Sequence, residues 1–107
     1  MEISEFYADL KNAMTDAHIP TAHNVFLQRM KPPYLLYRDS FDHIAANSRN
    51  VLKKHRIIME LYAAQTDADA AEEAVEEFLD GFTTYSKDRT FDDEQQLYVT
   101  YYQFYIV

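Results

Sequence analysis

The stretch that decides the fold prediction is residues 54–64, KHRIIMELYAA. Its apolar side chains recur at every second position, at Ile57, Met59, Leu61 and Ala63. An alternation with a period of two is typical of a β-strand that buries one face. We therefore expect a strand here, with a layer of other elements packed against it.

The residues that follow this strand predict a helix ending near Asp80. Thr66 can cap its first turn, and Asp69 places a negative charge where the helix dipole favours one. Gly81, the only glycine of the chain, follows at the position where a left-handed residue often ends a helix. The apolar stripe of this helix consists of Ala71, Ala74, Val75, Phe78 and Leu79.

Before residue 54, the pattern predicts a helix over residues 2–17, which Pro20 prevents from continuing. Two strands, over residues 24–30 and 34–37, are expected on either side of Pro32 and Pro33. Residues 39–50 contain turn formers without a sustained period, which predicts a long loop. Loops of this length often carry binding contacts.

After the second helix, residues 83–85 and 97–107 are expected to be strands joined by the acidic turn at residues 92–94. Helices segregated from antiparallel strands predict an α+β fold of two layers. The expected architecture is an antiparallel sheet of four to five strands with both helices packed on one face. The length of 107 residues fits one domain, 1–107.

Composition argues against several classes of function. Eighteen acidic residues against ten basic ones give a net charge of −8, which disfavours binding through nucleic-acid phosphates. The chain has no cysteine, which excludes a thiolate metal site and a cysteine nucleophile. One glycine does not suffice for a phosphate-binding loop. No apolar run approaches the roughly 20 residues of a membrane span, and the acidic N-terminus is unlike a signal peptide, so we expect a cytoplasmic site of synthesis.

The sequence offers little for catalysis. None of the four histidines forms a pair with the i, i+4 spacing of a helical metal site. No glycine-flanked serine elbow is present. Adjacent acidic residues are more typical of a solvated face than of an acid–base pair or a calcium loop. We expect a protein without catalytic residues, cofactor or metal; a small hydrolase is the minor alternative.

The last strand has aromatic side chains on both faces, at Tyr98, Tyr101, Tyr102, Phe104 and Tyr105. One set is expected to pack beneath the helices. The other set either tolerates water through its hydroxyl groups or is covered by another subunit, because tyrosine is enriched in interface cores.

Charge is segregated along the chain. Residues 67–80 contain seven acidic side chains and no basic one, whereas residues 49–56 contain four basic side chains and no acidic one. Such patches suit a head-to-tail contact between copies, which closes into a ring if the rotation allows. The alternatives are a contact within the monomer or two unrelated solvated patches.

Several stretches, in this order, resemble the small tail-completion proteins, or tail terminators, of long-tailed bacteriophages. The resemblance extends from the first helix to the last strand, and the stretches that carry it are PPYLLY at 32–37, DSFDHIAAN at 39–47, RIIMELY at 56–62, the acidic helix ending in Phe78-Leu79, and LYVTYY at 97–102. The chain departs from the pattern at residues 44–46, where relatives often carry an aromatic residue.

The resemblance implies a non-enzymatic structural protein of the virion. Its members form a ring, expected to be a hexamer, that caps the tail tube and joins it to the head connector, with assembly in the cytoplasm of the bacterial host. Its partners would be further copies of itself, the tail tube protein and the head–tail connector protein; DNA would pass through the lumen without specific binding, and no membrane is involved. An acidic inner surface would repel passing DNA.

Two sets of contact residues follow from the charge pattern and the resemblance. The expected interface between copies comprises Arg49, Lys53, Lys54, Arg56, Glu72, Glu73 and Glu76. The expected loop that contacts the tail or neck comprises Phe41, Asp42, His43, Ile44 and Asn47. The alternative function is a small acidic interaction or inhibitor domain, monomeric or dimeric, that mimics nucleic acid.

Overall fold

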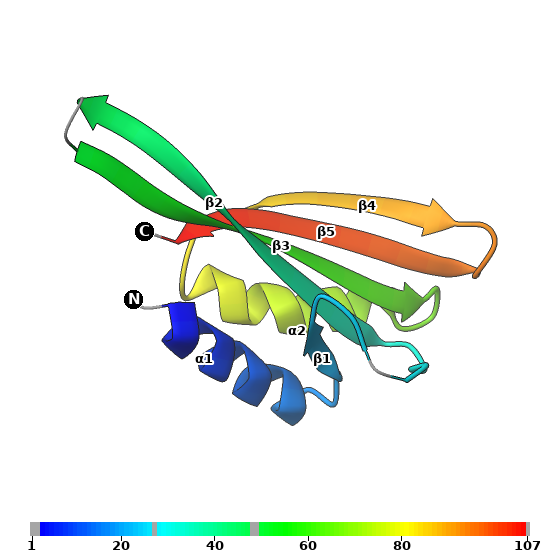
Figure 1. Ribbon diagram of the computed structural model, residues 1–107. Helices are drawn as coiled ribbons and strands as arrows, with labels where there is room; N and C mark the ends of the chain where they lie inside the picture. Colours follow the sequence, from blue (N-terminus) through cyan, green and yellow to red (C-terminus); the bar gives the residue numbers. More distant parts are fainter. Residues whose placement is uncertain (1–2, 27, 48–49, 107) are drawn as a thin grey trace.

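The computed structural model describes residues 3–26, 28–47 and 50–106, with the backbone alone for 41–47 and 50–54. It has two helices and a five-stranded sheet, which confirms the α+β class (Figure 1). The strands lie in the order β1-β2-β3-β5-β4. The elements are α1 (Ile3–Asp16), β1 (Thr21–His23), β2 (Tyr34–Asn47), β3 (Asn50–Ala64), α2 (Ala68–Asp80), β4 (Ser86–Asp92) and β5 (Leu97–Ile106).

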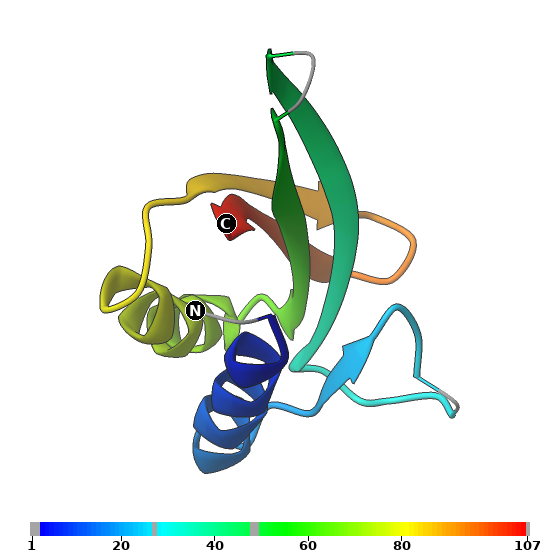
Figure 2. The same cartoon turned by 60° about the vertical axis from the view of Figure 1, so that its left-hand side comes forward.

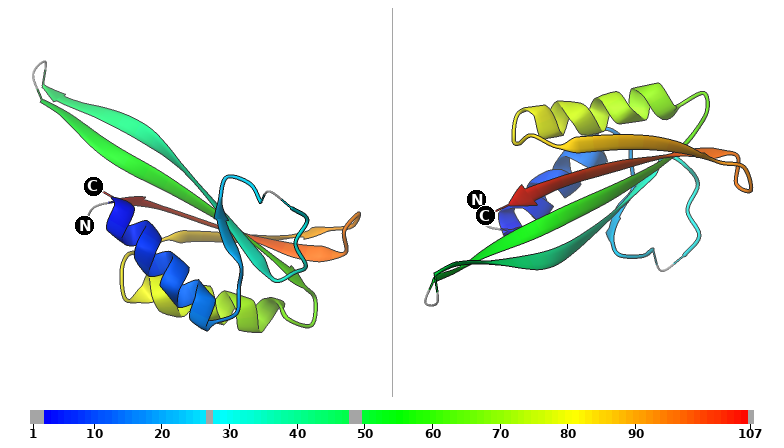
Figure 3. Two further views of the ribbon diagram at one scale, coloured as in Figure 1. Left: turned by 60° about the horizontal axis from the view of Figure 1, so that its bottom comes forward. Right: turned by 90° about the horizontal axis from the view of Figure 1, so that it is seen from above.

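Both helices cover one face of the sheet, as predicted (Figures 1 and 3). The alternation in β3 is confirmed, because every second residue from Ile57 to Ala63 is buried. The ring of Phe6 in α1 lies within 6 Å, centroid to centroid, of Phe78, Phe82 and Phe104. This aromatic cluster joins the two helices to the sheet in one core.

The expectation of a wholly antiparallel sheet was wrong at one edge, because β1 pairs parallel with β2. The strand expected over residues 24–30 was also misplaced. The described residues of that range form no strand, since Asn24 has a φ of 69° and turns the chain away after His23. The run of apolar residues at 25–27 suggested extended structure, but the turn at Asn24 decides the local geometry.

Residues 39–47 and 50, expected to belong to a loop, are instead strand residues in the outer part of a long β-hairpin, and residues 48 and 49 of that range lie outside the described part of the structure. β2 and β3 pair from Tyr34↔Tyr62 to Asn47↔Asn50, with a register shift between Ala45 and Asn47. The hairpin extends past the rest of the sheet (Figures 1 and 2). Hydrogen bonds between the two strands satisfy their backbone N–H and C=O groups. The residues themselves favour turns, so their pattern predicted a loop where strand pairing decides the structure.

Three smaller expectations also need correction. The strand expected at 83–85 begins only at Ser86. Thr66 does not cap α2, because the N-cap residue is Asp67, which makes no side-chain cap hydrogen bond. Gly81 has a φ of −78°, so the helix ends without a left-handed residue. The acidic turn is as expected: the Asp92 carboxylate accepts the backbone N–H of Glu94 at 3.0 Å and closes the β4–β5 hairpin.

Candidate functional site

The inner side of the acidic helix is neutralised within the chain. Glu72 of α2 is only 5% exposed and lies beneath β4. Its carboxylate is 2.7 Å from Lys87 Nζ and 2.8 Å from Arg89 Nε, and it accepts the Thr100 hydroxyl at 2.9 Å. A carboxylate with three such donors is well compensated for the loss of water.

Glu76, one turn further along α2, belongs to the same network. It accepts Lys87 Nζ at 2.9 Å and the Tyr102 hydroxyl at 3.0 Å. The hydrogen bond to Glu72 is the main cause that raises the pKa of Lys87, and burial followed by the hydrogen bond to Glu76 raises the pKa of Tyr102. The network therefore holds α2 against β4 and β5 through charge as well as apolar packing.

These contacts narrow the expected interface between copies. Glu72 is buried in its own chain and is withdrawn from that interface, and Glu76 is half-buried with its oxygens already engaged. Glu73 and Glu77 remain exposed on the outer side of α2. One face of α2 is buried and the opposite face is exposed, and this decides which carboxylates can contact another copy. A count of charges along the sequence does not show on which face each carboxylate lies.

The basic side of the expected interface lies on the β2–β3 hairpin. Arg56 Nε donates to the Ser40 hydroxyl across the two strands at 3.3 Å. Lys53 and Lys54 lie on the backbone of β3, but their side chains are outside the described part of the structure, as is Arg49 entirely. The backbone of β2 carries the expected contact residues Phe41, Asp42, His43, Ile44 and Asn47, whose side chains also lie outside the described part.

A cluster of polar and aromatic side chains holds the base of this hairpin. Asp39 of β2 lies 3.0 Å from His23 Nε2 on β1 and 3.9 Å from His55 Nδ1 on β3. The ring of His23 stacks on Tyr37 with centroids 4.9 Å apart, and Tyr7 of α1 packs on Tyr37 at 4.8 Å. Burial and the neighbouring Asp39 carboxylate raise the pKa of Tyr7.

The cluster ties three strands and a helix together where the hairpin leaves the sheet. Sequence reasoning missed it, because His23, Asp39 and His55 are distant along the chain and only strand register brings them together. Among the described side chains, no group of three or more His, Asp or Glu residues could hold a metal ion.

The face of the sheet that the helices leave open is rich in tyrosine. Tyr34 and Tyr62 stack with ring centroids 4.8 Å apart. The Tyr62 hydroxyl donates to Glu60 at 3.0 Å, and Arg38 contacts the same carboxylate at 2.7 Å. On β5 the aromatic residues divide as the alternation predicted: Tyr102 and Phe104 are buried beneath the helices, whereas Tyr101 and Tyr105 are 36% and 44% exposed on the open face.

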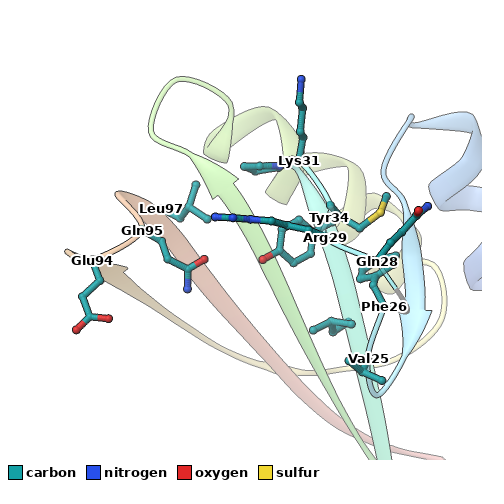
Figure 4. Close-up of a pocket in the computed structure, with 12 residues that line it drawn as sticks. Val25, Phe26, Gln28, Arg29, Lys31, Tyr34, Glu94, Gln95 and Leu97 are labelled. Carbon is teal, nitrogen blue, oxygen red and sulfur yellow. The ribbon is translucent and has the colours of Figure 1, made fainter.

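A hollow of about 790 Å³ lies at one end of this open face. In Figure 4 the Arg29 side chain extends across Tyr34 toward Leu97, and Lys31 points outward. Sequence reasoning did not predict this hollow, because it treated the segment that borders it as a strand. The lining residues include Phe26, Arg29, Tyr34, Leu36, Glu94 and Leu97.

The chain matches no protein-family model and no curated protein. Neither described helix has the length and apolar character needed to cross a membrane. The function is therefore inferred from the projecting hairpin, from the exposed carboxylates of α2 and from the basic residues that the sequence has at 49–56.

Proposed function

We propose that this protein is a structural, non-enzymatic component of a long-tailed bacteriophage. In this role it caps the tail tube as a ring, which we expect to be a hexamer, and joins the tube to the head connector. It would be assembled in the cytoplasm of the bacterial host and remain in the virion at the head–tail junction. Its partners are other copies of itself, the tail tube protein and the connector protein, and DNA passes through its lumen without specific binding.

The observation that carries the proposal is the β2–β3 hairpin, which projects past the rest of the sheet (Figures 1 and 2). The sequence has four basic residues at 49–56, and the outer side of α2 carries the exposed Glu73 and Glu77. The molecule is elongated, with principal extents of 50 × 28 × 27 Å. Basic residues in one part of the chain and exposed carboxylates in another favour a heterologous contact, which forms a ring when the rotation closes. The resemblance in sequence, described above, supports the same role.

Within this proposal the contact between copies pairs Arg49, Lys53, Lys54 and Arg56 with Glu73 and its exposed neighbours on α2. The hairpin residues Phe41, Asp42, His43, Ile44 and Asn47 contact the tail tube or neck. Electrostatic contacts of this kind steer association and weaken with salt.

Capping of isolated tail tubes tests the proposed role. Tubes from a long-tailed phage that encodes this chain are mixed with the purified protein and imaged by electron microscopy. We expect density at one end of each tube and no further elongation when free tube protein is added. Tubes that keep elongating, with the protein absent from their ends, would overturn the proposal.

A charge-reversal pair tests the interface. Lys53→Glu with Lys54→Glu should reduce capping, because it replaces two basic side chains on the hairpin with acidic ones. The matched control is Lys11→Glu with Lys31→Glu, which changes the net charge equally at two exposed positions outside the projecting part of the hairpin. Equal capping by both variants would contradict the charge-paired contact.

The alternative, an acidic domain that mimics nucleic acid, has less support. Such a mimic must present its carboxylates to a basic partner, yet Glu72 is buried and Glu76 is engaged by Lys87 and Tyr102. The outer carboxylates of α2 are too few to imitate the closely spaced phosphates of a duplex, which carries one charge per about 1.7 Å.

A further inference from the structure

The outer edge of β2 is covered over only a short length. β1 pairs with Leu35, Leu36 and Tyr37 and then ends. Among residues 3–26, 28–47 and 50–106, no strand pairs with the outer edge of β2 from Arg38 to Asn47. A long strand edge with unpaired N–H and C=O groups is a template for another strand.

The direction of the backbone groups along this edge follows from two hydrogen bonds. Leu35 N–H donates to Pro20 O at 2.8 Å, and Asn24 N–H donates to Tyr37 O at 2.8 Å. Odd-numbered residues of β2 therefore direct their backbone groups toward the β1 side, and even-numbered ones toward β3. Beyond Tyr37, residues 39, 41 and 43 present donors and acceptors to the open edge.

The opposite edge of the sheet is β4, which pairs only with β5. Charged side chains often guard such edges against pairing. Here the charged ends of Lys87 and Arg89 contact Glu72 and Glu76 on the helix face of the sheet, at 2.7–2.9 Å. These two side chains therefore do not block pairing along the β4 edge. The six residues from Ser86 to Phe91 are exposed.

The two edges are compatible in direction and in charge. β2, β3, β5 and β4 are antiparallel in turn, so β4 of a second copy placed beside β2 continues the alternation. On the open face β2 presents Arg38, which contacts Glu60 at 2.7 Å and is still 53% exposed, and β4 presents Asp88. Pairing β4 with another β4 would instead bring acidic side chains together on that face.

We propose that the free edge of β2, from Arg38 to Asn47, pairs antiparallel with the β4 edge of a second copy, so that one sheet continues from subunit to subunit. The inference rests on the proposed ring and gives that ring a backbone contact in addition to the charged one. When a strand is added to a sheet edge, main-chain hydrogen bonds provide the affinity. The side chains at alternate positions contact the neighbouring strand and determine the register of pairing.

Disulfide trapping tests this contact cleanly, because the chain has no cysteine of its own. Ser40→Cys on β2 is combined in one chain with Asp88→Cys, Thr90→Cys or Asp92→Cys on β4, which covers three registers on the same face. Within one subunit β2 and β4 are separated by β3 and β5, or about 14 Å at ~4.8 Å per strand, which is too far for a disulfide. Any bond between the two positions therefore joins two copies.

We expect one of the three variants to form a ladder of covalent multimers on oxidation, seen on a denaturing gel without reductant. The matched control combines Ser40→Cys with Gln103→Cys, which lies on the same face but on the inner strand β5 and should stay monomeric. Bonds that join only position 40 of one copy to position 40 of another, or that form only through position 103, would overturn the edge pairing.

The disulfide experiment and the tube-capping experiment can give different answers. Tube capping without a ladder would overturn the edge pairing and leave the tail-cap role intact. A ladder from a protein that never caps tubes would support the edge pairing and overturn the tail-cap role.

Discussion

Arg89 Nε on β4 donates to the carboxylate of Glu72 on α2 at 2.8 Å, and Lys87 reaches the other oxygen of that carboxylate at 2.7 Å. Because Glu72 is buried, its two basic partners hold β4 to the helix, and their side chains stay 35% and 32% exposed. The pair of contacts locks the edge strand β4 over the helix. It also holds the charged ends of Lys87 and Arg89 on the helix face of the sheet.

Removing the buried carboxylate should destabilise the chain strongly. Glu72→Ala leaves Lys87 and Arg89 without their main partner, and we expect the free energy of unfolding to fall by about 3 kcal/mol, since both basic groups keep some access to water. Glu73→Ala, on the exposed side of the same helix, should change it by less than about 0.5 kcal/mol. Urea unfolding followed by circular dichroism measures both; equal midpoints would contradict the network.

Stability should fall at alkaline pH. Burial, then the hydrogen bond to Asp80, raises the pKa of Tyr85 to about 12, above its ordinary value of 10.0. The pKa of Lys87 is likewise raised, chiefly by its hydrogen bond to Glu72. Groups whose folded pKa is raised contribute stability below their unfolded pKa and lose it as the pH rises through the folded value.

We therefore expect the urea midpoint to hold from pH 7 to 9 and to decline between about pH 10 and pH 12. The double variant Tyr85→Phe with Lys87→Met should begin at a lower midpoint and decline less over the same interval. A decline as steep as that of the unaltered chain would show that these two groups do not carry the effect.

Proline substitutions at two successive positions of β2 should affect its two edges differently, because successive backbone N–H groups point to opposite edges. Asp42→Pro removes a donor directed toward β3, and amide protection in the hairpin should fall about fivefold, as expected for one lost bond of ~1 kcal/mol. His43→Pro removes a donor directed to the open edge, where proline is tolerated, and should leave that protection nearly unchanged.

Self-association should show the effect of His43→Pro instead. In the cysteine-pair background that yields the covalent ladder, His43→Pro should reduce the ladder while hydrogen exchange reports an intact hairpin. An undiminished ladder would mean that this donor makes no contact with a neighbouring copy.

The sequence predicted the elements with strong periodicity and failed where strand register decides the outcome. The alternation from Ile57 to Ala63 and the stripe of α2 follow from burial of one face, so both were predicted correctly. Residues 39–47 and 50 were expected to belong to a loop, because their strand character comes from pairing between β2 and β3 and not from the residues of either strand.

The charge pattern was informative about surfaces but not about which carboxylates lie on them. Seven acidic residues in and just before α2 suggested one acidic face, yet the helix period places Glu72 inside and Glu73 outside. The basic partners Lys87 and Arg89 lie in a strand whose start was predicted too early, so their pairing with α2 could not be anticipated.

Assembly of copies of this chain into a ring at the end of a tail tube is the central proposal. Light scattering of the purified protein, alone and with isolated tail tubes, at low and high salt, tests it most directly. We predict a discrete multiple near six protomers, in solution or bound at the tube end, that dissociates as salt is raised. A protein that remains monomeric at every salt concentration and leaves tail tubes unbound would contradict it.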